Sequence, residues 1–364
     1  MIRMGWFRSG ARGGMVRKFS VLAAVLLACS LVLSGTPAGA EENPPSTFQI
    51  LARAEKIVYG DTKGGGLIDR LNGIEKDLFG RGLPGSISDR QTALVSFLEK
   101  GNAGQPSLLF KLAVAEWVLS QRIRSGDAVA QRIDALETQL EGTSLQDKPM
   151  SMRLERVLSL LLSEAVVWKD VEVPAALVLR SELARKLSPS TSKVGDEVLL
   201  TLRQDVVVES HLVVGRGSRV VGKVTEVSKP RSFGRAAEVK VVMEKLLPLG
   251  PEEIPVTIGE EAKKASQAES AQIAAAGTSF LGAILLGPLG LAGGFLVRGN
   301  VKEIPEGTPI YVQTVGAFRA SGFPIPAGLE SVVRDQNAAP ESPVSADAEP
   351  TPVERGGEDP ARSK

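Results

Sequence analysis

The side chains from which metal sites and acid–base relays are usually built are nearly missing from this chain. Its 364 residues include a single histidine, His211, and a single cysteine, Cys29. A multi-histidine metal site therefore has no material, and a catalytic relay would depend on His211 alone. Valine-rich runs flank His211, which indicates a strand edge or a turn. We expect no catalytic residue, no metal site and no cofactor.

Long apolar runs are also scarce, and the first of them has the form of an export signal. Five basic and no acidic residues precede the apolar segment Phe19–Leu33, and the small residues Ala38 and Ala40 follow it. This order predicts a signal peptide over 1–40 that is cleaved after Ala40. An uncleaved membrane anchor is the alternative, but the apolar segment is shorter than the ~20 residues that a spanning helix needs.

The cysteine offers a second alternative for the N-terminus. Leu26–Cys29 resembles the lipobox of bacterial lipoproteins, so lipidation of Cys29 competes with cleavage after Ala40. The apolar run continues past Cys29 over residues 31–33, which favours cleavage after Ala40. The mature chain then has no thiol and forms no disulfide.

An excess of basic charge is missing as well. Without the five basic residues of the signal, the 43 basic residues fall to 38 against 42 acidic ones, a net charge of −4. Nucleic-acid binding usually requires the opposite sign. We expect an exported protein of the periplasm or the outer membrane, with no nucleic-acid partner.

Residues 41–168 have the periodicity of helices. Apolar residues recur there at alternating spacings of four and three, which places one apolar stripe on each helix. Two such stripes are Val129, Ile133, Leu136 and Leu140, and Leu154, Leu158, Leu161 and Ala165.

A short unit repeats within this helical region. Glu55–Gly60 recurs as Glu75–Gly80 and, more loosely, as Glu137–Gly142. Arg70 and Arg132 stand five residues before the second and third glutamates. Each unit predicts an amphipathic helix that ends at a glycine in the left-handed conformation, so Gly60, Gly80 and Gly142 are the expected caps. The region is either a stacked platform for a partner or a helical bundle that reuses one cap.

From residue 171 to residue 332 the hydrophobic period changes to two. Short alternating runs separated by glycine-containing turns predict an antiparallel β sandwich or barrel. The fold class is therefore α+β, with a helical domain followed by a β domain. The tail over 333–364 has too few large apolar residues to fold. Clear alternating runs are Val239, Val241 and Met243; Ile254, Val256 and Ile258; and Ile310, Val312 and Thr314.

An apolar insert over 260–300 interrupts the β domain. Its uncharged part runs from Ser270 to Val297 and contains Pro288. Small residues recur there every four positions, which lets helix backbones approach closely. These expected packing positions are Ala275, Ser279, Ala283, Gly287, Gly290 and Gly294.

The ends of the insert restrict how it could meet a membrane. A single crossing would put the strands before Ile258 and after Ile304 on opposite sides, although both have the pattern of one β domain. We therefore expect a helical hairpin whose second arm is Leu289–Val297. At about 13 Å this arm is too short to cross the ~30 Å apolar core of a bilayer. Residues 270–297 either contact a membrane or pack on the β domain.

Four segments of the β domain carry a resemblance to a known family, namely Val173–Leu177, Leu212–Val224, Gly234–Gly250 and Ile304–Ile310. The β domain resembles the C-terminal barrel of the TrbI-like family, the outer-membrane channel component of conjugation and type IV secretion machines. The resemblance implies a helical hairpin that projects from the barrel into the outer membrane, and a ring of copies that lines a channel. Family members usually keep a membrane anchor and a proline-rich arm, where this chain has a signal and helical repeats.

These observations predict a non-enzymatic cell-envelope protein with a structural or interaction role. The expected partner is a second copy of the chain or another envelope protein. A channel-forming outer-membrane component is one alternative, and a wall hydrolase that uses carboxylates is another. The adjacent pairs Glu252–Glu253 and Glu260–Glu261 do not suit a hydrolase, because its two carboxylates must face each other across a cleft.

Overall fold

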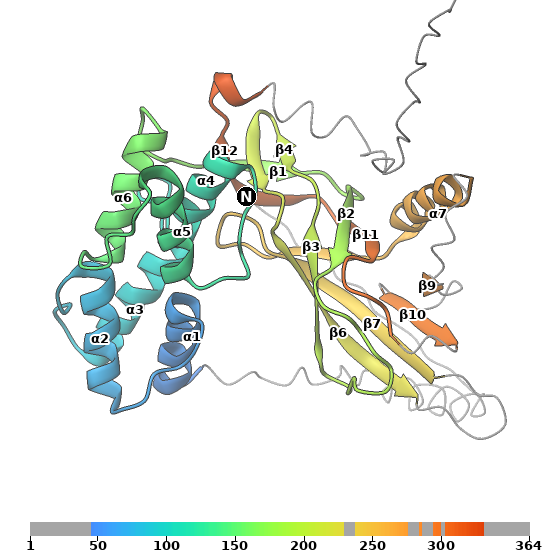
Figure 1. Cartoon of the computed structure of the whole chain (residues 1–364), viewed down its shortest axis with the longest axis horizontal. Coiled ribbons are helices and arrows are strands. Elements are labelled where there is room, and N and C mark those ends of the chain that lie inside the picture. Colours follow the sequence, from blue (N-terminus) through green and yellow to red (C-terminus); the bar gives the residue numbers. More distant parts are fainter. Residues whose placement is uncertain (1–44, 229–236, 276–283, 286–293, 300–302, 331–364) are drawn as a thin grey trace, which may run out of the picture. The chain divides into compact units, whose positions relative to one another are not determined.

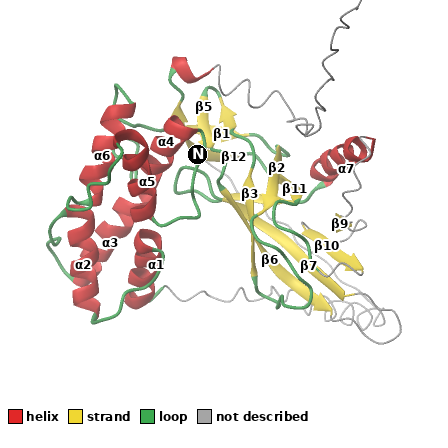
Figure 2. Ribbon diagram, viewed as in Figure 1, coloured by secondary structure: helices red, strands yellow, loops and turns green. Residues whose placement is uncertain are grey.

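The computed structural model describes residues 45–228, 237–275, 284–285, 294–299 and 303–330. The described helices and strands all belong to one compact unit that starts at Thr47 (Figure 1). Most helices lie together apart from the strands, as Figure 2 shows by colour, and α7 (Glu260–Ala275) lies beside β2 and β11. The α+β class and the N-terminal group of helices are confirmed.

Six α-helices form the helical part of the chain. The fourth is apolar on all sides because it lies in the centre of the core, where it contacts the fifth, the sixth and the π-helical turn. The elements are α1 (Thr47–Tyr59), α2 (Leu67–Phe79), α3 (Ile87–Val95), the π-helical turn η1 (Ser96–Lys100), α4 (Leu108–Ser120), α5 (Val129–Glu141) and α6 (Met150–Leu161).

The predicted apolar stripes hold over most of their length. Val129, Ile133 and Leu136 of α5 are buried, as are Leu154 and Leu158 of α6. The prediction fails at the end of the second stripe, because α6 ends at Leu161 and Ala165 is exposed beyond it.

Of the two predicted β architectures, the chain forms a closed barrel. Six described strands pair antiparallel in the order β6-β3-β2-β11-β8-β7, and β7 pairs back with β6 to complete the ring. Closure leaves no open edge in the ring, so each strand has hydrogen-bonded neighbours on both sides. The strands are β2 (Val178–Leu183), β3 (Glu197–Leu202), β6 (Arg219–Ser228), β7 (Ala237–Leu246), β8 (Ile254–Thr257) and β11 (Pro309–Thr314).

A four-stranded antiparallel sheet lies between the helical core and the barrel core. Leu212 and Phe323 of this sheet belong to the cluster of buried residues around the helices. Val171 and Val213 belong to the cluster inside the barrel. The sheet thus contributes to both cores. Its order is β1 (Lys169–Val173), β12 (Phe318–Pro324), β5 (His211–Val214) and β4 (Val206–Val208).

The insert differs from the predicted helical hairpin. Helix α7 (Glu260–Ala275) leads into it, and the strands β9 (Ile284–Leu285) and β10 (Gly294–Gly299) follow. Strand β10 pairs with β7, from Gly294 opposite Val242 to Gly299 opposite Ala237. The predicted helical second arm is therefore wrong at its end. Strand β8 pairs only with Lys245 and Leu246 of β7, and β10 pairs with the earlier residues of that long strand. Among the described helices, none is long and apolar enough to cross a membrane.

Candidate functional site

Buried carboxylates recur through the helical part at one structural position. Within the described residues, four glutamates with exposed fractions of 0 to 2% each form an ion pair with an arginine on the next helix. The separations between the nitrogen and oxygen atoms are 2.6 to 2.7 Å. The pairs are Glu55–Arg70, Glu75–Arg90, Glu116–Arg132 and Glu137–Arg153.

Each of these carboxylates also accepts a hydrogen bond from the loop that follows its helix. The donor is the backbone N–H eight residues later, at 2.9 to 3.1 Å. The loop therefore folds back over the end of its own helix, and the same carboxylate holds both the loop and the next helix. The donors are Lys63, Leu83, Arg124 and Leu145.

The expected cap residues lie where these loops begin. Gly60, Gly80 and Gly142 have φ of 88°, 77° and 76°, and their N–H groups donate to the carbonyls of Lys56, Lys76 and Thr138. This is the left-handed conformation that favours glycine. In the fourth unit Gln121 takes the same conformation, with φ of 52°.

The sequence pattern missed the fourth unit. Gln121 replaces the glycine there, so Glu116 does not stand out in the chain. A different signal finds all four units, namely a glutamate followed by an arginine after 15 or 16 residues. The units fall into two groups, α1 to α3 and α4 to α6. Val95 and Leu158 stand where the last helix of each group would carry the next glutamate.

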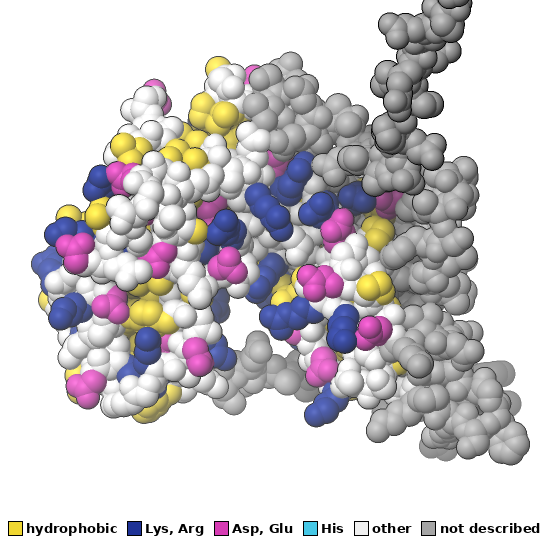
Figure 3. Space-filling view, viewed as in Figure 1, with side chains coloured by type: hydrophobic (Ala, Val, Ile, Leu, Met, Phe, Trp, Pro, Cys, Tyr) yellow, Lys and Arg dark blue, Asp and Glu magenta, His cyan; other side chains and the backbone are white. Residues whose placement is uncertain are grey.

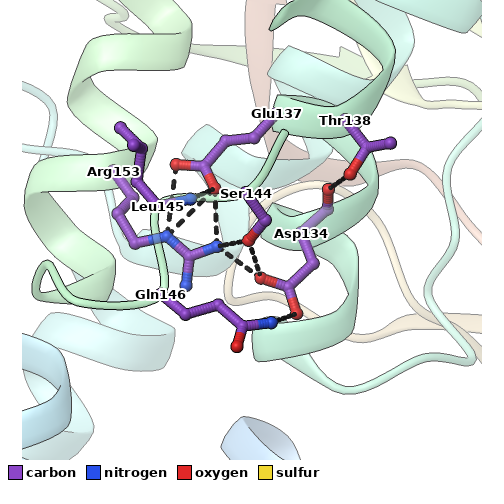
Figure 4. A network of polar contacts seen from close by, with 7 residues as sticks. All are labelled: Asp134, Glu137, Thr138, Ser144, Leu145, Gln146 and Arg153. Carbon is purple, nitrogen blue, oxygen red and sulfur yellow. Dashed lines mark hydrogen bonds and ion pairs between the residues drawn. The ribbon is translucent and has the colours of Figure 1, made fainter. Parts of the chain in front are cut away.

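Arg153 has the richest set of partners among these arginines (Figure 4). Its Nη2 donates to Glu137 Oε2 at 2.6 Å and to Ser144 Oγ at 2.8 Å, and it also pairs with Asp134. Burial would raise the pKa of Glu137, but hydrogen bonds from Arg153 and from the Leu145 amide outweigh it and leave the pKa below its usual value. The Arg153 guanidinium thus pairs with both carboxylates of this network.

The balance at Glu55 is the same. Burial opposes its charge, and the Arg70 guanidinium and the Lys63 amide lower its pKa below the usual value. In the described part of the chain, no three His, Cys, Asp or Glu side chains gather so as to hold a metal ion. The role that this arrangement supports is structural, because each ion pair fixes the distance between two consecutive helices.

A second feature joins the helical part to the barrel. The loop between α4 and α5 meets the turn between β5 and β6, and we call these two segments, residues 121–128 and 215–218, the junction. The Ile123 N–H donates to the Arg216 carbonyl at 2.7 Å, and Ser125 Oγ donates to the Gly217 carbonyl at 2.9 Å. Gly217 has φ of 93°, and a Cβ there would lie 2.1 Å from the Ile123 carbonyl oxygen. Only glycine allows this approach.

The junction turn is not a cradle for phosphate. The Arg216 N–H donates to Asp205 Oδ1 at 2.7 Å, the Gly217 N–H to the Leu202 carbonyl at 2.8 Å, and the Ser218 N–H to the Gly215 carbonyl at 3.1 Å. Each of these amides is occupied within the fold. Any ligand at the junction would therefore be recognised by side chains.

The predicted packing positions of the insert fall at its described edges or outside them. Ala275 is the last residue of α7, and Gly294 is the first residue of β10. The other positions lie outside the described residues, as do the signal residues: Ser279, Ala283, Gly287, Gly290, Ala38 and Ala40.

The adjacent carboxylate pairs are tied to neighbouring side chains. Glu253 pairs with Lys245, and Glu260 and Glu261 pair with lysines three residues later on α7. Glu252 Oε1 accepts a hydrogen bond from Ser321 Oγ at 2.7 Å.

Comparisons with known proteins add little to this geometry. No family model and no curated protein matches the chain. Among solved structures, part of the chain is similar to ComB10 of the Com type IV secretion system of Helicobacter pylori. The similarity covers 43% of this chain and 92% of ComB10, at 14% sequence identity and a TM-score of 0.21. A TM-score this low carries no argument about fold or function, so the resemblance to TrbI-like channels stays a prediction.

Proposed function

We propose that the protein is a non-enzymatic scaffold of the cell envelope, in which a stiff set of helical repeats is fixed to a small barrel and offered to a partner. The observation that carries this proposal is the fourfold tie between each buried glutamate, the following loop and the next helix. Buried charges that neutralise one another in this way stabilise a shape and leave no group free for acid–base chemistry.

The junction supports a scaffold role for the whole unit. Backbone hydrogen bonds between Ile123 and Arg216, and the close approach at Gly217, resist rotation of the helices against the barrel. A force on the helices, or a partner bound to them, would then also move the barrel. The proposed partner is a second copy of the chain or another envelope protein.

The ends of the insert support membrane contact by a re-entrant segment. Helix α7 follows β8, and β10 returns to pair with β7, so the segment leaves and rejoins the same barrel. A single crossing would separate strands that are hydrogen-bonded to each other. We propose that residues 270–297 dip into a membrane or mediate self-association.

Cell fractionation of a loop variant tests this proposal. Residues 276–293 would be replaced by a Gly/Ser loop, which leaves α7 and β10 in place. The native protein should require detergent for extraction, and the variant should fractionate with soluble periplasmic proteins at an unchanged melting temperature. A variant that still requires detergent would show that the anchor lies elsewhere, and an unfolded variant would show that the insert belongs to the core.

The N-terminus of the extracted protein tests the route of export. Cleavage after Ala40 gives a mature chain that starts at Glu41, which intact mass spectrometry would detect. A diacylated Cys29 would instead make the protein a lipoprotein, anchored through its lipid.

A channel-forming outer-membrane component remains the second candidate. It is favoured by the attachment of both ends of the apolar insert to one closed barrel. Ring-shaped particles in electron micrographs of the detergent extract would support it, and monomers or dimers would support the scaffold. Wall-degrading activity of the purified protein would contradict both candidates.

A further inference from the structure

Arginines at and beside the junction differ from those of the helical repeats. In the repeats each buried glutamate has its arginine. Around the junction, five guanidinium groups lie without a carboxylate of the described residues within 4.0 Å. They belong to Arg122, Arg124, Arg185, Arg216 and Arg219.

Backbone and side-chain contacts bring four of these arginines to one place. Arg122 and Arg124 are exposed and flank Ile123, whose N–H binds the Arg216 carbonyl. Arg219, at the start of β6, reaches back to the same loop, since its Nη2 lies 2.7 Å from the position that a Cβ on Gly126 would take. Gly126 thus leaves room for the guanidinium.

Arg185 completes the group, because it follows Ala184, whose N–H donates to the Leu199 carbonyl of β3 at 2.9 Å, and Arg219 is paired with Thr201 of the same strand. Burial lowers the pKa of Arg219, and the positive charge of Arg185 acts in the same direction. Arg216 adds a buried Nε that has no hydrogen-bond acceptor within the described residues. Neighbouring cations and an unused donor are the features that a bound anion would satisfy.

Local carboxylates compensate only part of this charge. Asp127 and Glu197 act on Arg219 in the opposite direction, without forming an ion pair with it. Asp205 is buried, and burial raises its pKa, while the Arg216 amide and the Arg216 charge act in the opposite direction. Figure 3 shows basic side chains gathered over β2, β3 and β6, with acidic ones among them. Five arginines against these three carboxylates leave an excess of two positive charges.

We propose that the junction binds a small ligand with clustered phosphate groups, with Arg185 and Arg219 at the centre and Arg122, Arg124 and Arg216 around them. Guanidinium forks bind phosphate oxygens in pairs, and the backbone amides of the turn are already occupied, so the side chains carry recognition. A long polyanion such as nucleic acid fits less well, because the mature chain has a net charge of −4. Binding would stiffen the contact between helices and barrel, because the arginines come from both.

Calorimetric titration of the mature protein with inorganic pyrophosphate at low salt tests the site. We expect one pyrophosphate per chain and a higher melting temperature when it is present. The double variant Arg185→Gln with Arg219→Gln should bind at least about tenfold more weakly, because each lost charge-assisted contact is worth about a factor of ten. The control Arg156→Gln removes one positive charge from α6, as Arg185→Gln alone does at the junction. Arg156 pairs with Glu141 and is half exposed, and this variant should bind within about twofold of the native protein.

Vesicles distinguish a soluble ligand from a lipid headgroup. Binding of the native protein and the variants would be compared on vesicles of phosphatidylglycerol in phosphatidylcholine. Loss of pyrophosphate binding alone in the double variant indicates a soluble phosphate ligand, and loss of vesicle binding indicates a headgroup. Equal binding by the double variant and the Arg156→Gln control, or no binding of either probe to the native protein, would overturn the proposal.

The fold of the double variant is checked without ligand. Since Arg185 and Arg219 repel each other, their replacement should leave the melting temperature unchanged or raise it. If the double variant does not fold, Arg185→Gln alone decides the matter, because Arg185 is exposed beyond the end of β2. This single variant should bind pyrophosphate about tenfold more weakly.

Discussion

The helical part and the β part of this protein bury different kinds of polar group. Beside the uncharged Gln91 and Ser107, the helical part buries charges, namely four glutamates together with Arg132 and Arg153. Apart from Asp205, the described β part buries hydroxyl groups: Ser181, Ser218, Thr308, Thr314 and Ser321.

The difference follows from how the backbone N–H and C=O groups of each part find hydrogen-bond partners. Loops after helices carry amides without partners, and a carboxylate that accepts from them can bind an arginine at the same time. In the closed barrel, strand pairing satisfies most backbone groups around the ring. The few that remain are within reach of a short hydroxyl side chain. Thr314 Oγ1, for example, donates to the Pro174 carbonyl at 2.8 Å. Buried charges thus satisfy the backbone amides of irregular loops, and ring closure satisfies the backbone groups of the regular strands.

Removal of one buried glutamate should destabilise the helical part more than any of the other substitutions. Glu137→Ala leaves the buried Arg153 without its main partner, and we expect a loss of about 3–5 kcal/mol in the free energy of unfolding. Urea denaturation measures it. Glu141→Ala, which breaks the surface pair with Arg156, should cost under about 1 kcal/mol. Equal losses in both variants would mean that the buried pair is not special.

A methyl group at the junction should uncouple the two parts. Gly217→Ala must move the Ile123 carbonyl, so it should cost more than the about 1–3 kcal/mol of an unfavourable φ alone. Gly195→Ala is the matched control, because Gly195 has φ of 92° and open space around it. Only Gly217→Ala should speed tryptic cleavage after Arg122 and Arg124. Similar cleavage in both variants would contradict a fixed junction.

Acid should weaken the helical part before the barrel. The pKa values of Glu55 and Glu137 are lowered on folding from the usual value of 4.5, so their stabilisation is complete above that pH and is lost as the pH falls through the lower folded values. Far-ultraviolet circular dichroism in urea, followed against pH, measures this loss. Glu137→Gln should flatten the pH dependence, and an unchanged slope would exclude Glu137 as its source.

The smallest effect is expected from placing glycine at the one helix cap of the repeats that lacks it. Gln121 has φ of 52°, where glycine is free of the strain that other residues carry. Gln121→Gly should raise the free energy of unfolding by about 1 kcal/mol. The reverse change at the equivalent position, Gly142→Gln, should lower it by a similar amount. Calorimetric melting curves of the two variants should shift in opposite directions.

Local features of this fold could be predicted from the sequence. The stripe of Val129, Ile133 and Leu136 indicated α5 because a helix returns to one face every 3.6 residues. The alternation of Ile310 and Val312 indicated β11 in the same way. Both patterns depend only on near neighbours in the chain.

Features that depend on distant contacts could not be predicted. Ile123 meets Arg216 across the junction, and nothing in the sequence pairs these two residues. Strand β10 was expected to be helical, because the four-residue spacing of small residues suited helix packing. The sequence did not show that β7 extends beyond the two residues that pair with β8. The partners of the repeated glutamates were missed for the same reason, since each arginine lies on the next helix.

The spacing of the glutamate–arginine pairs also sets the order in which the chain can fold. Each pair closes once 15 or 16 further residues have been made or translocated, so the helices can assemble one after another from the N-terminus. The barrel must wait, because Ser181 on β2 donates to the Ile310 carbonyl 129 residues later. A chain that emerges slowly from a narrow pore would thus present folded helices while its first strands are still unpaired.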